Sequence, residues 1–398
     1  MNSVTELKVK PNYIKQYKNK YPLITMDAVT NPDEPMEEGG IVHLVDKTHQ
    51  FIAKGYYGKQ NKGIGWILTL KKDEQIDGAF FKSKILTAVN KRQSFYKDED
   101  TNAFRIFNGE GDGIGGLTID YFDGFYLINW YSEGIYSFKD QVIDVLDELG
   151  GYQAIYEKKR FDTKGKYMDD DDFVKGVRGE FPIIVKENSI SYAVYLNDGA
   201  MVGVFLDQRD VRKAIRDNYA QGKNVLNTFS YTGAFSVAAA LGGADKTTSV
   251  DLAKRSKSKT IEQFSVNGID YEAQNITVMD VFDYFRYAKR KNLKFDLVVL
   301  DPPSFARSKK RTFSSAKDYP DLIKDTIAIT EKHGVIIAST NNATFGMKKF
   351  RTFIDKAFKE MNTTYKIVET FSLPADFQVN RNFPQGDYLK VVVIEKLK

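Results

Sequence analysis

Short apolar runs and amphipathic stretches alternate along roughly the last 200 residues of the chain. The apolar runs predict strands at 225–229, 248–251, 276–280, 295–300 and 335–339. The stretches between them predict helices at 234–241, 254–266, 281–289 and 319–332. A last alternating pair lies at 365–369 and 388–395. Strands and helices in alternation predict an α/β fold with a doubly wound, parallel-rich sheet.

The first 185 residues have a different pattern, which indicates two further domains. Residues 1–72 contain three short apolar runs about ten residues apart, which is typical of a small β-rich barrel or sandwich. Residues 73–185 combine a helix at 80–95 with strands at 104–107, 117–121 and 125–131. Ser137 is expected to cap a further helix that ends at Leu149. We therefore predict three domains, at 1–72, 73–185 and 186–398.

The stretch 224–251 carries the clearest functional signal. A strand that ends at Phe229 leads into the turn Ser230–Gly233, then a helix of small residues, then a strand that ends at Asp251. In half a Rossmann-like nucleotide site, an acid about 20 residues after the turn binds a ribose diol. Gly233 is the only glycine of this turn, whereas a pyrophosphate site uses three. The stretch therefore favours a nucleoside ligand without phosphates, such as S-adenosylmethionine, although a turn without any ligand stays open.

Three predicted strands end in an acid, namely Asp251, Asp280 and Asp301. Because the carboxyl ends of parallel strands share one edge of a sheet, we expect these acids to face one crevice. Asp251 is then placed for the ribose hydroxyls, Asp280 and the main chain of Val281 for the adenine, and Asp301 for the reacting end. One such acid is often only a helix cap. Three at successive strand ends favour a ligand site.

Pro302 and Pro303 follow Asp301 directly. Proline fixes φ, so two in a row after a buried strand predict a stiff corner. Such a corner can hold a flat acceptor base at a fixed angle to a methyl donor. Phe305 is a candidate to stack on that base.

Composition changes this picture mainly by exclusion. The 398 residues have a net charge of +5, which is compatible with a nucleic-acid partner. No cysteine is present, which excludes disulfides, thiolate metal sites and cysteine nucleophiles. His43, His49 and His333 are too scattered to suggest a metal site, and no metal is assigned. No apolar run resembles a signal peptide or could span a bilayer, so we expect a cytoplasmic protein without membrane contact.

Two loops have an unusual composition. The glycine-dense stretch 109–116 is suited to cradling a phosphate, but Glu110 and Asp112 within it favour a tight structural connection. Lys158–Arg160 and Asp169–Asp172 carry opposite charges and predict an exposed loop. Four aspartates can bind a divalent cation, but such a run is more often only solvated.

These motifs together resemble the class I S-adenosylmethionine-dependent methyltransferases of large-subunit ribosomal RNA. Relatives of this kind include the 5-methylcytosine enzymes of the RlmI type, which have an N-terminal PUA domain, and the N7-guanine module of RlmK. The resemblance rests on the stretches 109–113, 205–209, 227–236, 249–251, 301–305 and 383–390. It implies a PUA domain, a middle α/β domain and a Rossmann-like domain with S-adenosylmethionine as cofactor. The residues that it implies as lining the cofactor, together with their neighbours in the sequence, are Phe229, Ser230, Tyr231, Gly233, Asp251, Leu252, Asp280, Val281 and Asp301.

One departure from the family bears on the chemistry. The 5-methylcytosine relatives have a Ser-Cys-Ser motif where this sequence has Ser339–Asn342. Methylation of a cytosine carbon needs a thiolate that adds to the ring, whereas a base nitrogen needs only an in-line lone pair. We therefore expect methylation at a base nitrogen of 23S rRNA, with guanine before adenine or cytosine. Cytosine-C5 methylation and a non-catalytic RNA-binding or ribosome-assembly factor stay open. The candidate catalytic residues are Asp301, Pro302, Pro303, Phe305 and Asn341.

Basic residues beside the expected crevice, together with the N-terminal module, are candidates to contact RNA phosphates. A solvated surface is the alternative for each cluster. The candidates of the last domain are Arg209, Arg307, Lys309, Lys310 and Lys348. The sequence leaves the oligomeric state open, a homodimer included.

Overall fold

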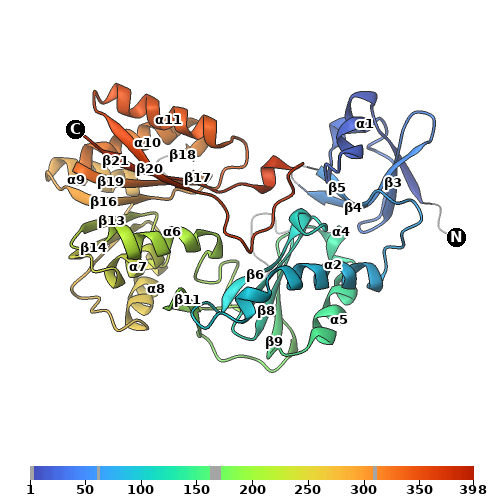
Figure 1. Ribbon diagram of the computed structural model, residues 1–398, viewed down its shortest axis with the longest axis horizontal. Helices are drawn as coiled ribbons and strands as arrows, with labels where there is room; N and C mark the ends of the chain where they lie inside the picture. Colours follow the sequence, from blue (N-terminus) through green and yellow to red (C-terminus); the bar gives the residue numbers. More distant parts are fainter. Residues whose placement is uncertain (1–3, 61–62, 162–171, 308–311) are drawn as a thin grey trace. The chain divides into compact units, whose positions relative to one another are not determined.

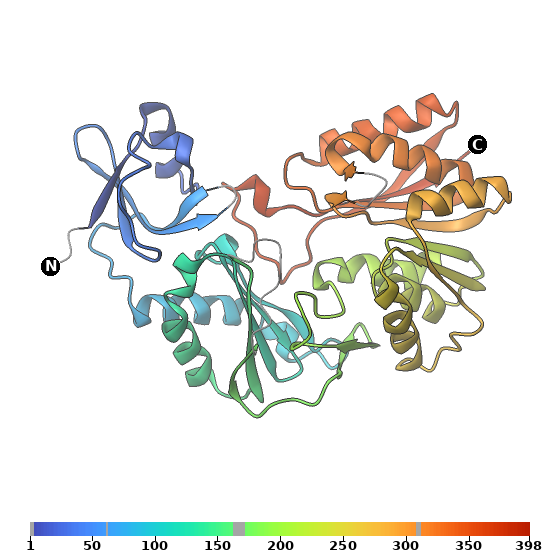
Figure 2. The ribbon, with the colours of Figure 1, turned by 180° about the vertical axis from the view of Figure 1, so that it is seen from behind.

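A computed structural model of the protein describes residues 4–60, 63–161, 172–307 and 312–398. Contacts between residues divide the chain into two compact units (Figures 1 and 2). Unit 1 comprises Met1–Ile183, Tyr195–Val202 and Ala375–Gly386. Unit 2 comprises Ile184–Val194, Gly203–Pro374 and Asp387–Lys398. Two segments of the predicted third domain thus pack within unit 1, and the domain limits at residues 72 and 185 stay predictions.

The N-terminal part of unit 1 is a small β-sheet. Its described strands follow the order β1-β3-β4-β5-β2, with β1 parallel to β3 and the other neighbours antiparallel. The predicted strands correspond to β3, β4 and β5. The first two strands and the helix α1 (Pro11–Lys18) were not predicted, because they lack an apolar run long enough to signal an element. The strands are β1 (Thr5–Lys8), β2 (Leu23–Ile24), β3 (Ile41–Val45), β4 (Phe51–Gln60) and β5 (Gly63–Thr69).

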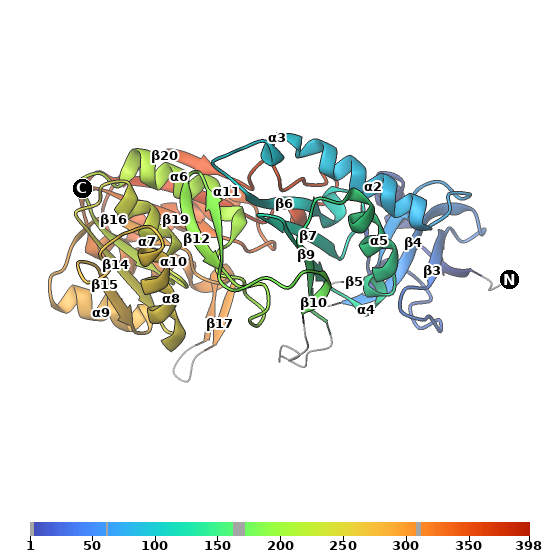
Figure 3. The same ribbon diagram turned by 90° about the horizontal axis from the view of Figure 1, so that it is seen from below.

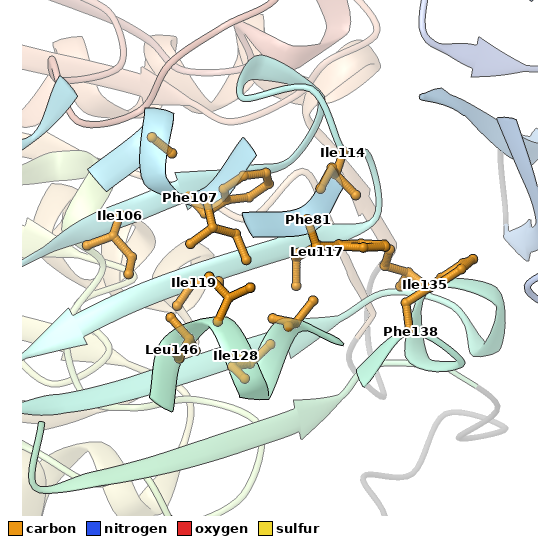
Figure 4. Packing of buried hydrophobic residues seen from close by; sticks show 14 of the residues in the cluster. Phe81, Ile106, Phe107, Ile114, Leu117, Ile119, Ile128, Ile135, Phe138 and Leu146 are labelled. Atoms are coloured by element: carbon orange, nitrogen blue, oxygen red, sulfur yellow. The ribbon is translucent and has the colours of Figure 1, made fainter. Parts of the chain in front are cut away.

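The second sheet of unit 1 has the order β10-β9-β8-β7-β6 and is antiparallel except for the parallel pair β8–β9. Its strands are β6 (Ala103–Asn108), β7 (Leu117–Phe122), β8 (Phe125–Trp130), β9 (Ala154–Lys159) and β10 (Phe173–Gly176). The helices are α2 (Gly78–Lys91), α3 (Gln93–Tyr96), α4 (Glu133–Tyr136) and α5 (Lys139–Leu149). Figure 4 shows the core that forms where Phe81 of α2 and Leu146 of α5 meet Ile119 and Ile128 of the sheet.

The start of α5 differs from the prediction. Ser137 does not cap this helix, which begins at Lys139 after Phe138 and has no side-chain cap. The Ser137 hydroxyl instead donates to the Gly134 carbonyl at 2.8 Å, at the end of the short helix α4. The prediction failed because the sequence gives no sign that α4 precedes α5.

The basic run at 158–160 is not simply part of an exposed loop. Lys158 lies in β9, is fully buried, and forms an ion pair with the buried Asp172. A buried ammonium group is tolerated when a carboxylate replaces its lost hydration. The other aspartates of the acidic run, at 169–171, lie outside the described residues.

The described part of unit 2 is built on a seven-stranded sheet of order β15-β14-β13-β16-β19-β21-β20. The first five strands in this order run parallel, and β21 is antiparallel to both of its neighbours. These strands are β13 (Asn224–Thr228), β14 (Lys246–Asp251), β15 (Asn275–Val278), β16 (Phe295–Leu300), β19 (Thr330–Thr340), β20 (Tyr365–Phe371) and β21 (Lys390–Lys396). Two further pairs stand apart from this sheet (Figure 3), namely β11 (Ile183–Glu187) with β12 (Ile190–Val194) and β17 (Phe305–Arg307) with β18 (Thr312–Ser314).

Helices cover both faces of this sheet (Figure 1). Successive residues of a strand point to opposite faces, so Val225 packs in a cluster with Phe235 of α7, and Leu226 packs in another with Phe285 of α9. The helices are α6 (Arg209–Ala214), which continues as a π-helical turn to Tyr219, α7 (Ala234–Leu241), α8 (Lys254–Ser265), α9 (Val281–Arg290), α10 (Ser315–Ile329) and α11 (Met347–Glu360). The predicted doubly wound α/β fold is confirmed.

Two features are absent from the residues that the structure describes. No helix among them is long and apolar enough to cross a membrane. The same residues contain no group of three or more His, Asp or Glu side chains that could hold a metal ion.

Candidate cofactor site

The turn after β13 has an unusual backbone. Phe229, Tyr231 and Gly233 have φ angles of 53°, 52° and 81°, in the left-handed region that side chains disfavour. A Cβ at Gly233 would lie 2.6 Å from the Thr260 Cγ2 atom, so this position has no room for a side chain. For the non-glycine residues Phe229 and Tyr231, such strain costs about 1–3 kcal/mol each and often accompanies a functional site.

Hydrogen bonds to the neighbouring strand hold this turn in place. The Ser230 amide donates to the Val250 carbonyl at 3.0 Å, and the Tyr231 amide donates to Asp251 Oδ2 at 2.9 Å. The Gly233 amide closes the turn on the Ser230 carbonyl at 2.7 Å. The end of β14 thus fixes the shape of the turn that follows β13.

A distant segment, 203–208, packs on the same turn. The Gly203 amide donates to the Tyr231 hydroxyl at 3.0 Å, and the Thr232 hydroxyl donates to the Gly203 carbonyl at 2.6 Å. The rings of Phe205 and Tyr231 lie 5.4 Å apart. The family-like stretch 205–209 is thereby brought to the carboxyl edge of the sheet.

The carboxylate of Asp251 is oriented by two backbone amides. Its Oδ2 accepts from Tyr231 at 2.9 Å, and its Oδ1 accepts from the Ala253 amide at 2.8 Å. Each carboxylate oxygen can accept two hydrogen bonds. Asp251 therefore keeps one acceptor position on each oxygen, which suits the two hydroxyls of a ribose.

Asp280 caps a helix, which is the role that the sequence leaves open for any single acid. Its Oδ1 accepts from the Phe282 amide at 2.9 Å and from the Asp283 amide at 3.4 Å, at the first turn of α9. Its other oxygen has no hydrogen bond among the described residues. Capping and ligand binding are therefore compatible at this carboxylate.

Asp301 belongs to a polar network of three distant segments. Gln208 Nε2 donates to Asp301 Oδ1 at 3.3 Å and to Ser339 Oγ at 2.9 Å. Burial raises the pKa of Asp301 to about 6, and the nearby Asp207 also raises it, whereas Ser339, Arg212 and Gln208 lower it. The Tyr319 hydroxyl fixes the strand end beside this network by donating to the Ser339 carbonyl at 2.5 Å. Asp301 is therefore ionised above a pH of about 6 and protonated below it.

A cavity of about 390 Å³ joins these elements within unit 2. Most of the predicted site residues line it, namely Phe229, Ser230, Tyr231, Asp251, Leu252, Asp280, Val281, Asp301, Pro302, Pro303, Arg307 and Asn341. Of the predicted cofactor-lining and catalytic residues, Gly233 and Phe305 do not line it. Gly233 shapes the turn behind the cavity, and Phe305 lies on β17 with 62% of its surface exposed.

The residues predicted to contact RNA are not equivalent. Arg307 is exposed beside the cavity, and Lys348 is exposed in the first turn of α11. Arg209 is only 4% exposed in α6, and this burial weighs against a contact with an RNA phosphate. Lys309 and Lys310 lie outside the described residues.

Sequence reasoning gave no role to several residues that line the cavity. Among them are Asp207 and Gln208, which place polar groups beside Asp301, and Phe282 and Phe313, which form part of the apolar wall. The available signal for the first two was the stretch 205–209, in which polar residues interrupt an apolar run just before a helix. The two phenylalanines gave no signal, since an aromatic residue near a strand end is usually core.

The cavity fits S-adenosylmethionine. Its volume is within the range of about 300–1,000 Å³ that is usual for small-molecule sites. Asp251 offers paired acceptors for a ribose, Phe282 and Leu252 offer apolar surface for a base, and the acids Asp207 and Asp301 suit a cationic group. The turn lacks the three glycines that would let a backbone enclose a pyrophosphate.

A family model described as S-adenosylmethionine-dependent methyltransferase matches residues 105–384 of the chain. The chain belongs to this family. A second model, described as a PUA-like domain, matches residues 7–70. The resemblance found in the sequence is thereby confirmed, and the cofactor of this methyltransferase is S-adenosylmethionine.

Named relatives of this methyltransferase cover nearly its whole length. A Bacillus subtilis protein with the provisional name ribosomal RNA large subunit methyltransferase YwbD is 64% identical over 392 residues, 98% of this chain and 99% of its own. The ribosomal RNA large subunit methyltransferase I of Alteromonas mediterranea is 30% identical over 390 residues, 97% of this chain and 98% of its own.

A solved structure is similar over the same length. It is the crystal structure of SMU.776, provisionally described as a methyltransferase and complexed with SAH. Its TM-score with this chain is 0.91 at 38% identity, and the match covers 98% of this chain and 100% of the other.

Proposed function

We propose that this methyltransferase modifies a base of the 23S rRNA of the large ribosomal subunit, at a ring nitrogen and preferably of guanine. The names of its relatives in Bacillus subtilis and Alteromonas mediterranea support the RNA substrate. The observation that carries the choice of nitrogen is the absence of cysteine from the whole sequence. Carbon methylation of cytosine depends on a thiolate that adds to the ring, which this chain cannot supply.

S-adenosylmethionine, when bound, supplies the methyl group from its sulfonium. The protein's part is then to hold the cofactor and to orient the base. Asp251 holds the ribose hydroxyls, and Asp280 and Val281 hold the adenine. We assign Asp301 and its neighbours to the acceptor base, and their place in the lining of the same cavity supports this assignment.

Asp301 has the chemistry of a base-positioning carboxylate. In its ionised form it accepts a hydrogen bond from an N–H group of the base, which raises the electron density on the ring. Gln208 keeps the carboxylate in one orientation. Pro302 and Pro303 stiffen the corner, Asn341 contacts the base edge, and the exposed Phe305 stacks on the base.

A cytosine-C5 activity, the reaction of the RlmI-type relatives, would need another nucleophile. Ser339 shares the hydrogen-bond network of Asp301, but it is 1% exposed and accepts a hydrogen bond from Gln208. A carboxylate with a pKa of about 6 is a weak base toward an alcohol. These contacts favour a structural role for Ser339.

The deciding experiment is methyl transfer from labelled S-adenosylmethionine to 23S rRNA that lacks the native modification, followed by mass spectrometry of the nucleosides. We expect a methylguanosine with the label on the base. 5-Methylcytidine as the product would overturn the argument from the missing thiolate. Cofactor binding without any transfer would support the alternative of a non-catalytic RNA-binding or assembly factor.

We also infer that the enzyme works in the cytoplasm, where ribosomal RNA of the kind named for its relatives is modified. A homodimer stays a prediction. Sedimentation of the protein with and without RNA would measure its oligomeric state.

A further inference from the structure

Unit 1 contains a polar cleft that shares no lining residue with the cofactor cavity of unit 2. One cavity of about 880 Å³ lies against α2, the glycine-dense loop and residues 379–381. An adjoining cavity of about 360 Å³ extends to the end of β5 and to Lys20. The two cavities form one cleft, since both are lined by Glu74, Lys84, Glu110, Gly113 and Asn380.

The walls of this cleft are fixed by a buried arginine. Arg92 is 1% exposed and donates to both carboxylate oxygens of Asp112, at 2.9 and 2.7 Å. It also donates to the Asp376 carbonyl at 2.6 Å, which joins the glycine-dense loop to the segment 375–386. A Cβ at Gly111 would lie 1.8 Å from the Gln378 carbonyl oxygen, so the two backbones touch. The cleft is therefore preformed.

Lysines from three separate segments converge on this cleft. Burial lowers the pKa of Lys84, and Lys20, Lys71 and Lys91 lower it further, while Glu74 opposes them. Among the described residues, Lys20, Lys71 and Lys84 form no ion pair. The repulsion among these lysines is only partly offset by Glu74, and a bound polyanion would relieve it further.

The acids of the cleft do little to neutralise these lysines. Asp77 accepts from the Phe80 amide as the cap of α2, and Asp112 is held by Arg92 and forms an ion pair with Lys91 at 3.6 Å. Burial raises the pKa of Glu110 to about 7, so its carboxyl carries only part of a negative charge at neutral pH. Glu74 also lines the cleft, and its carboxylate accepts no hydrogen bond from the described residues.

We propose that this cleft binds the sugar–phosphate backbone of an RNA strand, with Lys84 as its central phosphate contact. The proposal rests on the proposed function in so far as RNA is the substrate. Lys20, Lys71 and Arg381 line the same cleft from separate segments and are exposed, so they lie at its rim. Cations spread along two adjoining cavities suit a row of phosphates better than one small anion.

Lys84→Gln tests this cleft, and Lys82→Gln is its matched control. Lys82 lies on the same helix but is half-exposed, forms an ion pair with Glu148, and does not line the cleft. Affinity for a 23S rRNA fragment is measured by fluorescence anisotropy at several salt concentrations. Arg381→Gln, on a different segment, serves as a second variant in case Lys84→Gln perturbs folding.

One phosphate contact contributes about 0.7–0.9 to the slope of log K against log salt concentration. Its loss should therefore weaken RNA binding about 5- to 8-fold at 0.1 M salt and flatten the slope by that amount. We expect this change for Lys84→Gln and Arg381→Gln, and unchanged RNA affinity for Lys82→Gln. Calorimetry should give the same S-adenosylmethionine affinity for all three variants.

Equal RNA affinity for Lys84→Gln and Lys82→Gln, in an enzyme that still methylates rRNA, would overturn the cleft and leave the proposed function standing. If Lys84→Gln binds RNA more weakly but the wild type transfers no methyl group to rRNA, the cleft is supported and the proposed function is overturned. Inorganic phosphate and chloride are also compared as competitors of RNA for the wild type at matched ionic strength. Displacement of the RNA by phosphate but not by chloride would show a site for a small anion and overturn the proposal.

Discussion

Asp251 offers the most direct test of the cofactor site. In Asp251→Ala the carboxylate that faces the ribose is lost. The remaining acceptor position on each oxygen is assigned to a ribose hydroxyl, and the loss of a hydrogen bond to a charged group costs about 1.5–3 kcal/mol. This range corresponds to a rise of about 12- to 160-fold in the Kd for S-adenosylmethionine.

The same substitution also removes the acceptor for the Tyr231 and Ala253 amides, so a weaker affinity alone does not prove a ribose contact. Asp296→Ala is the matched control. Its carboxylate accepts from the Asn224 amide at 2.9 Å, at the opposite end of β13. A lost bond of this kind costs about 1 kcal/mol, and each kcal/mol lowers Tm by about 2–4 °C in a domain of this size.

Isothermal titration calorimetry and thermal unfolding are then run on both variants. We expect both to lose a few degrees of Tm, and only Asp251→Ala to lose cofactor affinity. The reasoning is refuted if folded Asp251→Ala binds S-adenosylmethionine as tightly as the wild type, because the acid would then serve only the turn. Equal losses of affinity in both variants would point to a general effect on the sheet.

Four further predictions concern the cofactor cavity and the residues around it. Since Asp301 has a pKa of about 6, kcat/KM should rise as the pH passes through about 6 and then level off, and Asp301→Asn should abolish this step. The pKa of Asp301 is raised from 3.8 in the folded protein, so its protonated carboxyl contributes a stability that is complete below pH 3.8 and lost as the pH rises through about 6. The free energy of unfolding, measured by chemical denaturation, should therefore depend less on pH in Asp301→Asn than in the wild type. Gly233→Ala should cost more stability and cofactor affinity than Gly268→Ala, because both glycines have positive φ but only at Gly233 would a Cβ lie against Thr260. Equal losses of Tm in the two variants would contradict this steric argument. Phe305→Ala should leave cofactor affinity unchanged and raise the KM for RNA by the equivalent of about 1–3 kcal/mol, the value of one stacked base; an unchanged KM would remove Phe305 from the base site.

Much of the fold was readable because its signals are local. The parallel strands of unit 2 are short apolar runs, and helix α7 ends at the two glycines that follow Leu241, so periodicity and turn residues located both. The predictions failed where an element was too short to show a period, as at β2, or where one helix directly preceded another, as at Ser137. The positions of Asp251, Asp280 and Asp301 on one cavity followed from a general rule, since parallel strands end at one edge.

The sequence by itself determined the α/β fold, the nucleoside character of the site and the absence of a thiolate nucleophile. Only the tertiary structure decided which side chains meet across long separations. It joined Gln208, Asp301 and Ser339 in one network, turned Arg209 inward, and gathered Lys20, Lys71 and Lys84 around one cleft. The physical reason is that hydrophobic periodicity specifies which face of an element is buried, whereas the polar neighbours of a side chain depend on how distant elements pack.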